Sequence, residues 1–353
     1  MGKSTLFNVL TSAGAVVGNF PFTTIDPNVG TAVVPDARLE RLFDIFRPKK
    51  KTPATMEFLD IAGLIAGASE GEGLGNQFLA HIREVDAVLH VLRCFEDPDV
   101  VHVSGSADPV RDAGIVDTEL ALSDLASAEK RLSKAEKLGR TGDLKQRSEA
   151  AALAPIVALL DAGKPVRSEP LPPESNAILP SLHLLTAKPV LYVANVGEKE
   201  VNAESPAVAA VRAMAKEQGA GVIVLSCKLE SEIAELPESE RAAFLADAGL
   251  KEPGVARLIR EAYSLLGLIS FLTGGGDDEV RAWPVRKGSQ APQAAGKIHS
   301  DIEKGFIRAE IVSFADLDRL GNMQACKEAG KLRLEGRDYV VQDGDVVNFR
   351  FSA

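Results

Sequence analysis

Cysteine is scarce in this sequence. The three cysteines, Cys94, Cys227 and Cys326, lie far apart in the chain and are odd in number. They show neither the spacing of a disulfide framework nor that of a structural zinc site, and separate thiols suit a reducing compartment. The scarcity therefore excludes a small disulfide-stabilised secreted protein.

Long apolar runs and an excess of positive charge are also lacking. No stretch reaches the roughly 18 apolar residues that span a membrane, and the N-terminus has no signal-peptide pattern. We therefore expect a cytoplasmic protein with no membrane partner. The formal net charge of -10 argues against DNA binding over the whole surface, so no DNA partner is expected, although a local basic patch remains open.

The bulk composition is that of an ordinary soluble chain. Its 353 residues are 45% hydrophobic and 25% charged, which allows two or three domains with a sizeable core. Short apolar runs at residues 55–60, 87–92, 190–194 and 221–225 predict buried strands. Since helix-length segments separate them, the fold class is α/β, with a parallel sheet covered by helices on both faces.

Residues 116–168 do not follow this alternation of strands and helices. Leucine and alanine recur at helical spacing up to Ala135, Gly139 and Gly142 interrupt the pattern, and a second helix continues to about residue 162. This predicts an antiparallel helical hairpin inserted into the sheet domain. From residue 130 to residue 147 there are seven basic side chains and two acidic ones. The stretch is either a solvated tip or a contact for an anionic partner.

The sequence pattern changes again after residue 268. Glycines 274–276 predict a flexible joint, residues 279–285, 339–341 and 346–351 predict strands, and residues 291–300 predict a short helix. This is typical of a small β-rich domain. The predicted domains are thus 1–115 with 187–268, an insertion at 116–186, and a C-terminal domain at 269–353.

The first residues carry a fragment of a phosphate-binding motif. Gly2, Lys3, Ser4 and Thr5 match the second half of the P-loop pattern G-x-x-x-x-G-K-[ST], which normally follows a β-strand. The first glycine of the pattern and the strand before it are absent from the sequence. Four such residues also occur by chance or at an ordinary helix start, so the assignment depends on motifs farther along the chain.

Two such motifs follow in the expected order. Asp60-Ile-Ala-Gly63 ends a predicted strand, where P-loop proteins place an aspartate that holds Mg²⁺ and a glycine whose amide senses the γ-phosphate. The alternative is a plain strand-to-turn junction. Thr24 lies between the P-loop fragment and Asp60, in a loop where a threonine can complete the coordination of Mg²⁺ while the γ-phosphate is present. The alternative there is a simple turn.

Two further segments concern the base. Asn195-Val-Gly-Glu198 stands where GTPases have Asn-Lys-x-Asp, so Val196 replaces the lysine and Glu198 the aspartate. The glutamate carboxylate is on a longer side chain than aspartate, so it is not at the right distance to accept hydrogen bonds from the guanine edge. The apolar valine can pack on the flat face of any purine. Both substitutions argue against strict guanine specificity. Ser226 begins the segment after the strand at 221–225. In P-loop nucleotide-binding proteins, main-chain amides of this segment usually lie against the base. Together the five matches indicate a nucleotide-binding protein.

With these motifs the chain resembles one family, the Obg-like ATPases or YchF family. The resemblance rests on the segments 2–5, 19–28, 60–64 with 71–77, 93–96, 102–105 and 195–198, and in the C-terminal part on 279–283, 291–299 and 306–309. It covers essentially the whole chain. It implies an N-terminally truncated Ras-like P-loop domain with an inserted α-helical hairpin and a C-terminal β-grasp module of the TGS type.

The resemblance also implies a function. It indicates a ribosome-associated ATPase, a nucleotide-dependent switch that acts with the large subunit and ribosomal RNA. Lys3 would contact the β- and γ-phosphates, while Ser4, Thr24 and Asp60 would hold Mg²⁺. Gly63 would sense the γ-phosphate.

The remaining carried-over roles concern the base and the attacking water. Asn195 and Glu198 would lie at the adenine pocket. Leu64 stands where Ras-type enzymes have the glutamine that orients the water, and leucine cannot do this. The resemblance gives that role to His102, because a histidine both donates and accepts protons near neutral pH. His81 and His90 are interpreted as structural.

Two departures from the family pattern stand out. The missing strand and loop glycine lead us to expect a misplaced start site, with Met1 at a valine codon, and weak nucleotide binding by a chain that truly begins there. Pro284 stands where the family commonly has threonine. Because proline cannot donate to a strand ladder, its strand is expected to lie at an edge or to lose its pairing there.

Three functions remain open at this point. The first is a slow ATPase switch, and the second is a ribosome- or RNA-binding module with a vestigial nucleotide site. The hairpin tip and the basic side chains Arg281, Arg286, Lys287, Lys297, Lys304 and Arg308 would then bind phosphate, or merely form a solvated face. The third is a GTPase of the neighbouring Obg class, against which Val196 and Glu198 argue.

Overall fold

The computed structural model describes residues 2–12, 28–61, 74–96, 107–274 and 278–352. These residues pack as two compact units. The first contains the described parts of 1–9, 18–30 and 59–255, and the second those of 10–17, 31–58 and 256–353. Each unit is therefore assembled from segments that are far apart in the sequence.

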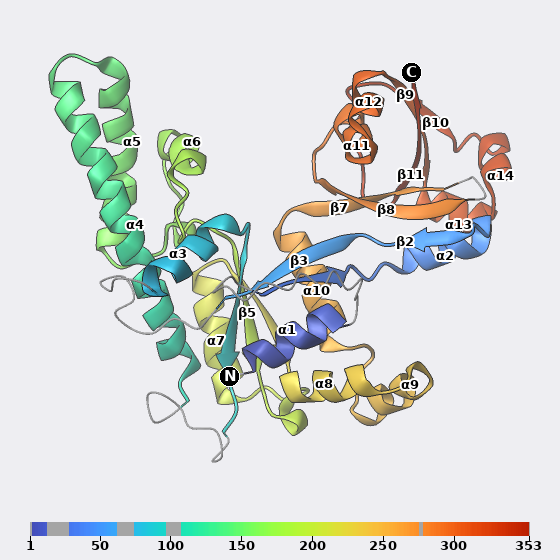
Figure 1. Ribbon diagram of the computed structural model, residues 1–353, viewed down its shortest axis with the longest axis horizontal. Helices are drawn as coiled ribbons and strands as arrows, with labels where there is room; N and C mark the ends of the chain where they lie inside the picture. Colours follow the sequence, from blue (N-terminus) through green and yellow to red (C-terminus); the bar gives the residue numbers. More distant parts are fainter. Residues whose placement is uncertain (1, 13–27, 62–73, 97–106, 275–277, 353) are drawn as a thin grey trace. The chain divides into compact units, whose positions relative to one another are not determined.

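The first unit is built on a parallel sheet with the strand order β4–β5–β6, of which the central strand β5 is labelled in Figure 1. The strands are β4 (Val88–Arg93), β5 (Val190–Asn195) and β6 (Gly221–Leu225). Arg93 is the register partner of Asn195, and Asn195 that of Leu225, so the carboxyl ends of all three strands meet at one edge. Every residue of β5 is buried, which confirms the predicted parallel sheet with covered faces.

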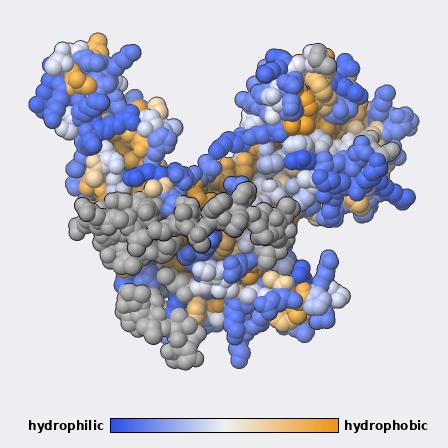
Figure 2. Space-filling view, in the orientation of Figure 1, coloured by the Kyte–Doolittle hydropathy of each residue, from blue (hydrophilic) through white to orange (hydrophobic). Residues whose placement is uncertain are grey.

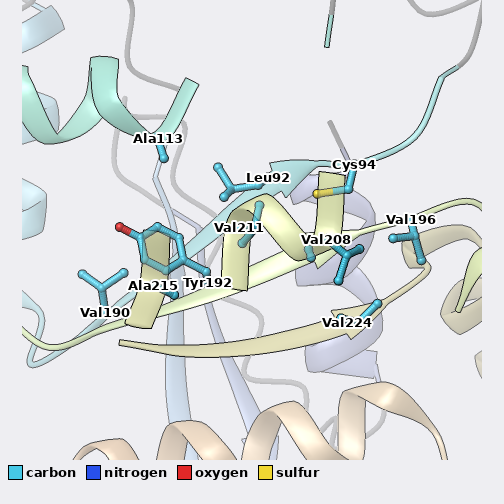
Figure 3. Close-up of a cluster of buried hydrophobic side chains, with 11 residues drawn as sticks. Leu92, Cys94, Ala113, Val190, Tyr192, Val196, Val208, Val211, Ala215 and Val224 are labelled. Atoms are coloured by element: carbon cyan, nitrogen blue, oxygen red, sulfur yellow. The ribbon is translucent and has the colours of Figure 1, made fainter. Parts of the chain in front are cut away.

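Helix α7 (Pro206–Glu217) packs on this sheet through a stripe of small apolar side chains. Val208, Val211 and Ala215 are at most 1% exposed and face the β5 side chains of Val190 and Tyr192 (Figure 3). Their spacing of three and four residues places them on one helical face. Burying each valine side chain stabilises the fold by about 1.5 to 3 kcal/mol, so this layer fixes the sheet in position.

The predicted helical hairpin is confirmed. Helices α4 (Pro109–Arg140) and α5 (Leu144–Asp161) run antiparallel, side by side (Figure 1). Asp108 caps α4 by accepting from the amide of Arg111 at 3.0 Å, and Asp143 caps α5 by accepting from the amide of Lys145 at 2.9 Å. Such caps satisfy amides that a helix start leaves unpaired. The turn at 141–143 therefore ends one helix and begins the next.

A buried carboxylate fastens the root of the hairpin to the sheet. Asp124 on α4 is 1% exposed. It accepts from the amide of Leu185 at 2.9 Å, and from the amide and hydroxyl of Thr186 at 2.8 and 2.7 Å. Burial raises the pKa of Asp124, while these hydrogen bonds act in the opposite direction. The three donors lie just before β5, so α4 is tied to the strand that ends at Asn195.

A second buried polar cluster lies at the same root. The Nη2 atom of Arg167 donates to Asp117 Oδ1 at 2.6 Å and to Gln218 Oε1 at 2.9 Å. The hydroxyl of Tyr192 donates to the same Gln218 oxygen at 2.8 Å. The side chains of Arg167 and Asp117 are only 7% and 11% exposed. This cluster joins α4, the short helix η1 (Val166–Ser168), the C-cap residue of α7 and β5.

His90 on β4 lies beside that cluster. Its ring centroid is 5.6 Å from that of Tyr192. Burial lowers the pKa of His90 to about 4, although the nearby carboxylate of Asp117 acts to raise it. The imidazole is therefore neutral at physiological pH, in keeping with its interpretation as a structural residue.

The second unit contains a six-stranded sheet in the order β10–β9–β11–β7–β8–β2. Its strands from the C-terminal part of the chain are β7 (Leu268–Thr273), β8 (Glu279–Arg286), β9 (Phe306–Ser313), β10 (Arg333–Glu335) and β11 (Asp345–Phe351). The helices α11 (Ala291–Ile298) and α12 (Ser300–Lys304) pack against it over a core that contains Phe271, Phe306 and Phe349. The predicted small β-rich domain is therefore observed.

Sequence analysis did not foresee that residues from the first hundred join this unit. Strand β2 (Lys50–Thr52) pairs in parallel with residues 279–281 of β8, and helix α2 (Ala37–Phe46) packs on β8. Arg38 on α2 bridges Asp36 and Asp343, each at 2.8 Å. Residues 31–58, predicted within the first domain, thus pack with the C-terminal sheet.

The remaining elements complete the described chain. Strands β1 (Asn28–Val33) and β3 (Thr55–Asp60) form a two-stranded sheet. The other helices are α1 (Lys3–Ser12), α3 (Leu74–Glu84), α6 (Pro173–Leu182), η2 (Glu198–Glu200), α8 (Cys227–Glu235), α9 (Glu238–Asp247), α10 (Gly254–Leu265), α13 (Phe314–Leu320) and α14 (Met323–Glu328). Among the described helices none has the length and apolar content to cross a bilayer.

Two strand predictions need correction or completion. Residues 339–341 do not form a strand. Val340 alone among them makes an isolated bridge, to Gln290.

Pro284 lies on β8, which is an inner strand and not at the sheet edge, yet β2 pairs only with residues 279–281 of β8. Pairing on the β2 side has therefore ended before the proline, as its missing N–H requires.

Candidate nucleotide site

The candidate site lies at the carboxyl edge of the β4–β5–β6 sheet. In open α/β sheets ligands bind outside this edge. The side chain of Asn195, the last residue of β5, is only 3% exposed, and its Oδ1 atom accepts from the amide of Cys227 at 2.8 Å. The loops after β5 and β6 are thereby joined.

Asn195 also contacts the P-loop fragment. Gly2 has a φ of +88°, and a Cβ atom added there would lie 2.6 Å from Asn195 Nδ2 and 3.0 Å from Cys227 Sγ. Only glycine fits this left-handed conformation and close approach. The Gly2 carbonyl accepts from the amide of Leu6 at 2.8 Å, which begins helix α1. The start of α1 is thus set against the end of β5.

Lys3 and Asp60 meet in an ion pair. The Nζ atom of Lys3 donates to Asp60 Oδ1, and the two side chains are 38% and 10% exposed. The residues come from the start of α1 and the end of β3. An ammonium beside a carboxylate at a helix N-terminus is an arrangement that can take up a phosphate and a hard cation. The structure therefore brings together two of the predicted phosphate and metal residues.

Ser4 and Thr5 occupy the first turn of α1. Ser4 is exposed and Thr5 is partly buried, while Leu6, Val9 and Leu10 on the same helix are buried. The apolar side chains anchor the helix, and the hydroxyl of Ser4 stays accessible. A serine hydroxyl and the Asp60 carboxylate are both oxygen donors of the kind that Mg²⁺ prefers, so the residues present fit that ion.

The predicted base-binding residues divide into accessible and buried ones. Glu198 opens η2, is 38% exposed and forms an ion pair with Lys228 on α8. Val196 is 2% exposed and packs in the sheet core with Leu92 and Val208. The Val196 side chain therefore supports the loop from behind, whereas Glu198 faces solvent. The contact with Lys228 was not anticipated from the sequence.

Ser226 is also buried, at 1% exposed, and its hydroxyl caps α8 by accepting from the amide of Leu229 at 3.4 Å. Next to it, burial raises the pKa of the Cys227 thiol to about 12, with a further contribution from Glu230. A thiol of this kind is unreactive at neutral pH. Ser226 therefore shapes the loop through its hydroxyl, and Cys227 does so through its backbone amide, which donates to Asn195.

Two further supporting residues were missed by sequence reasoning. Glu230 is 2% exposed and accepts from the amides of Gly254 and Val255 at 2.7 and 3.1 Å, which caps helix α10. Arg93 at the end of β4 is 5% exposed, and its Nε atom donates to the Phe95 carbonyl at 3.1 Å. Arg93 is the last residue of β4 and Glu230 lies on α8, and their partners cannot be read from spacing alone.

Three predicted residues, Thr24, Gly63 and His102, lie outside the described residues. Their roles stay predictions. Within the described ranges, no group of three or more histidine, cysteine, aspartate or glutamate side chains is arranged to hold a metal. A P-loop magnesium site does not need such a group, because hydroxyl and phosphate oxygens supply much of its coordination.

Family models match both ends of the chain. The model described as "50S ribosome-binding GTPase" matches residues 1–110. The YchF GTPase C-terminal model, described as "Protein of unknown function (DUF933)", matches residues 268–352.

Full-length relatives and a solved structure agree with these matches. The chain is 51% identical to "Ribosome-binding ATPase YchF" of Bacillus subtilis over 354 residues, covering 100% of this chain and 96% of the relative. It is 42% identical to "Obg-like ATPase 1" of Caenorhabditis elegans, covering 100% and 90%. The Schizosaccharomyces pombe YchF GTPase superposes with a TM-score of 0.87 at 36% identity, covering 99% of this chain and 95% of that one.

Proposed function

The chain belongs to the YchF family, and we propose that it is a ribosome-binding ATPase that hydrolyses ATP to ADP and phosphate as a nucleotide-dependent switch. Its relatives carry the names "Ribosome-binding ATPase YchF" and "Obg-like ATPase 1". The observation that carries the proposal is the meeting of Lys3 with Asp60 at the N-terminus of α1. These are the cation and the carboxylate that a P-loop enzyme needs around a triphosphate.

The phosphates would lie at the start of α1. Backbone amides of Gly2, Ser4 and Thr5 and the helix dipole favour an anion there, and Lys3 would leave Asp60 to contact the β- and γ-phosphates. Ser4, Thr24 and Asp60 would hold Mg²⁺, which when bound offsets the negative charge of the phosphate oxygens. Gly63 would donate its amide to the γ-phosphate.

The attacking water needs a positioning group. Leu64 has no polar atom on its side chain, and we assign this role to His102. An imidazole can accept a proton from water while its other nitrogen donates a hydrogen bond. Replacing His102 with alanine should lower the turnover number by about 100-fold or more and leave ATP affinity unchanged. Equal turnover would remove His102 from the mechanism.

Adenine would lie against the loops after β5 and β6. Asn195 already holds these loops together through the Cys227 amide, with Val196 and Ser226 supporting them. Glu198 would accept from the base, which requires its ion pair with Lys228 to open or shift. A glutamate at this position fits guanine less well than the shorter aspartate of GTPases, and we therefore propose a preference for ATP.

The partner would be the ribosome. We propose a cytoplasmic protein that contacts the large subunit and its RNA, with no DNA partner. The support is the ribosome-binding description of both the relatives and the family model. The predicted three-part division, with an insertion at 116–186 and a TGS-type β-grasp domain at 269–353, belongs to the same proposal.

Isothermal titration with ATP and GTP in the presence of Mg²⁺ tests the nucleotide assignment. We expect ATP to bind at least about tenfold more tightly than GTP, and the Lys3→Ala variant to lose binding of both. A matched control is Lys216→Ala, because Lys216 is an exposed lysine on α7 that has no role in the proposed site. Tight GTP and weak ATP binding would overturn the ATPase assignment.

A GTPase is the second candidate, and one observation favours it. The family model that matches residues 1–110 is described as a GTPase. The same titration separates the two candidates. Ribosome binding that persists without any nucleotide binding would instead favour a binding module with a vestigial site.

A further inference from the structure

The loop after β5 and the first turn of α8 meet in an ion pair, beside the residues proposed to hold the base. The Nζ atom of Lys228 lies 2.5 Å from Glu198 Oε1. Glu198 begins η2, and Lys228 is the second residue of α8. The preceding residue, Cys227, donates its amide to Asn195 Oδ1. The ion pair therefore stands next to the contact that joins the two loops.

The backbone on both sides of this ion pair is held in place. The Gly197 amide donates to Glu200 Oε2 at 3.1 Å, which closes the start of η2. Asn202 Nδ2 donates to the Ala248 carbonyl after α9 at 3.0 Å, and Val201 packs on the apolar cluster that α8 and α9 form. The two charged side chains thus meet because the elements that carry them are packed together.

The ion pair is also open to a ligand. Glu198 and Lys228 are 38% and 74% exposed, and Figure 2 shows hydrophilic residues over much of the surface of α8 and α9. The neighbouring carboxylates of Glu200 and Glu230 accept instead from backbone amides. Glu198 is therefore the carboxylate of these loops that a base can approach from solvent.

The lysine changes what this glutamate can offer to guanine. A carboxylate with both oxygens free can accept from the N1–H and from the 2-amino group of guanine together. With Oε1 held by the Lys228 ammonium, one oxygen remains, and a donor stands beside it. The second N–H of guanine would then face an ammonium and lack an acceptor, which weakens binding.

Adenine fits the same ion pair. Its edge carries one donor, the 6-amino group, next to one acceptor, N1. The remaining oxygen of Glu198 can accept from the amino group, while the Lys228 ammonium faces N1 without conflict. The ion pair has to shift toward the base for this contact, but it does not have to open.

We propose that Lys228 is a specificity-determining residue, which favours adenine over guanine by holding one oxygen of the Glu198 carboxylate. The inference rests on the proposed function, in which Glu198 contacts the base, and it adds to the effect of the longer glutamate side chain. Because both side chains are partly exposed, solvent screens the ion pair and its contribution is moderate. Lys228 should account for about fivefold of the preference for ATP.

Isothermal titration of the full chain with Mg²⁺ and ATP, GTP or inosine triphosphate tests the inference. Inosine has the N1–H of guanine and lacks its 2-amino group. The unchanged protein should bind ATP most tightly, then inosine triphosphate, then GTP. Lys228→Met keeps the apolar stem without the charge. It should narrow the ATP:GTP affinity ratio by about fivefold and remove the gap between inosine triphosphate and GTP.

The matched control is Lys199→Met. Lys199 is an exposed lysine next to Glu198 in the chain, and it forms no ion pair with any residue in the described ranges. Its loss removes the same charge from the same loop and should leave the affinity ratio unchanged. In a Glu198→Gln background, Lys228→Met should change the ratio by less than about twofold, because the lysine has no carboxylate left to hold.

A kinetic measurement separates specificity from a general disturbance of the fold. With saturating ATP, Lys228→Met should keep the turnover number of the unchanged protein, while KM rises by about twofold. A variant with a damaged site would lose turnover as well. An equal fall in the turnover numbers for ATP and GTP, with no change in their affinity ratio, would contradict the role of Lys228.

The outcomes distinguish this inference from the proposed function. An ATP:GTP ratio that Lys228→Met leaves unchanged would overturn the role of Lys228 and leave the ATPase assignment intact. The same change in Lys199→Met, or a full effect of Lys228→Met without Glu198, would also overturn it. If the unchanged protein binds neither ATP nor GTP, the proposed function is contradicted and the inference fails with it.

Discussion

The root and the tip of the helical hairpin differ in how they use charge. At the root, Asp117, Asp124 and Arg167 are buried or nearly so, and each carboxylate is hydrogen-bonded across elements. At the tip, Lys130, Lys134 and Lys137 are exposed and unpaired within the described chain. Both ends belong to one continuous helix, α4.

The difference follows from the dielectric surroundings. A charge inside the protein must be paired, because leaving water costs several kcal/mol. A charge at a solvated tip has no such requirement, and surface pairs contribute at most about 1 kcal/mol. The root should therefore determine the stability of the hairpin, and the tip should contribute little to it. Each prediction below changes one end of the hairpin and compares it with the other.

The largest effect is expected at Arg167. The Arg167→Met variant leaves Asp117 buried without its cation, which should reduce the free energy of unfolding by about 3 to 5 kcal/mol. Urea denaturation monitored by circular dichroism measures it. Arg131→Met, at a half-exposed ion pair with Glu149 nearer the tip, is the matched control and should cost about 1 kcal/mol or less.

A second variant sharpens the interpretation of Arg167. Its Nε and Nη1 atoms are buried without a hydrogen-bond partner among the described residues, so the pair is imperfectly satisfied. Combining Arg167→Met with Asp117→Leu should therefore recover much of the lost stability. Additive losses in the double variant would show that the charge pair is not the source of the effect.

Asp124 should come next. The Asp124→Ala variant leaves the amides of Leu185 and Thr186 without their acceptor in a buried site. We expect a loss of about 3 kcal/mol in the free energy of unfolding, measured by the same denaturation. Asp124→Asn keeps one acceptor oxygen and should lose less. A loss no larger than that of an exposed surface substitution would contradict the role of the root.

The pH dependence of the root is carried by His90. Its folded pKa of about 4 lies below the ordinary value of 6.5. The unfolded chain therefore binds a proton first as pH falls, and stability is lost below pH 6.5. The loss should reach about 1 to 2 kcal/mol by pH 5. Denaturation midpoints between pH 7 and pH 5 should fall less steeply in His90→Gln, and parallel profiles would be evidence against this assignment.

Closer to the tip, Asp143 should have a smaller effect. It caps α5 through the amides of Lys145 and Gln146 at 2.9 and 3.2 Å, in an exposed turn. Asp143→Ala should cost about 1 kcal/mol, and Asp143→Ser should restore most of it, because serine also caps helices. Thermal unfolding of the three proteins checks the order.

The smallest effect on stability is expected for the three exposed tip lysines. The triple variant Lys130→Ala, Lys134→Ala, Lys137→Ala should change the free energy of unfolding by no more than about 0.5 kcal/mol, measured by the same urea denaturation. A marked loss of stability in this variant would contradict the comparison between tip and root.

Much of the fold was predictable because its signals are local. The apolar runs at 55–60 and 221–225 coincide with β3 and β6, and the helical periodicity with Gly139 and Gly142 located the hairpin turn to within a few residues. Motif order assigned Lys3 and Asp60 to one predicted site, and the structure brings them into contact.

Long-range pairing could not be predicted from local signals. Residues 37–52 read as part of the first domain, but α2 and β2 join the sheet of the second unit, where β2 pairs with β8 more than two hundred residues away in sequence. Val196 and Ser226 are predicted at the base pocket, and the structure adds that the Val196 side chain packs in the core and the Ser226 hydroxyl caps α8. No local pattern distinguishes these uses.

The sequence by itself determined the P-loop-like fragment, the strand ends that follow it and the hairpin, because periodicity and motif order are properties of neighbouring residues. Only the tertiary structure decided which charges are free. Arg131 and Lys130 are adjacent in the chain and alike in charge, yet Arg131 forms an ion pair with Glu149 and Lys130 is exposed to water. The physical reason is that pairing depends on which elements fold together, and that is settled by long-range packing.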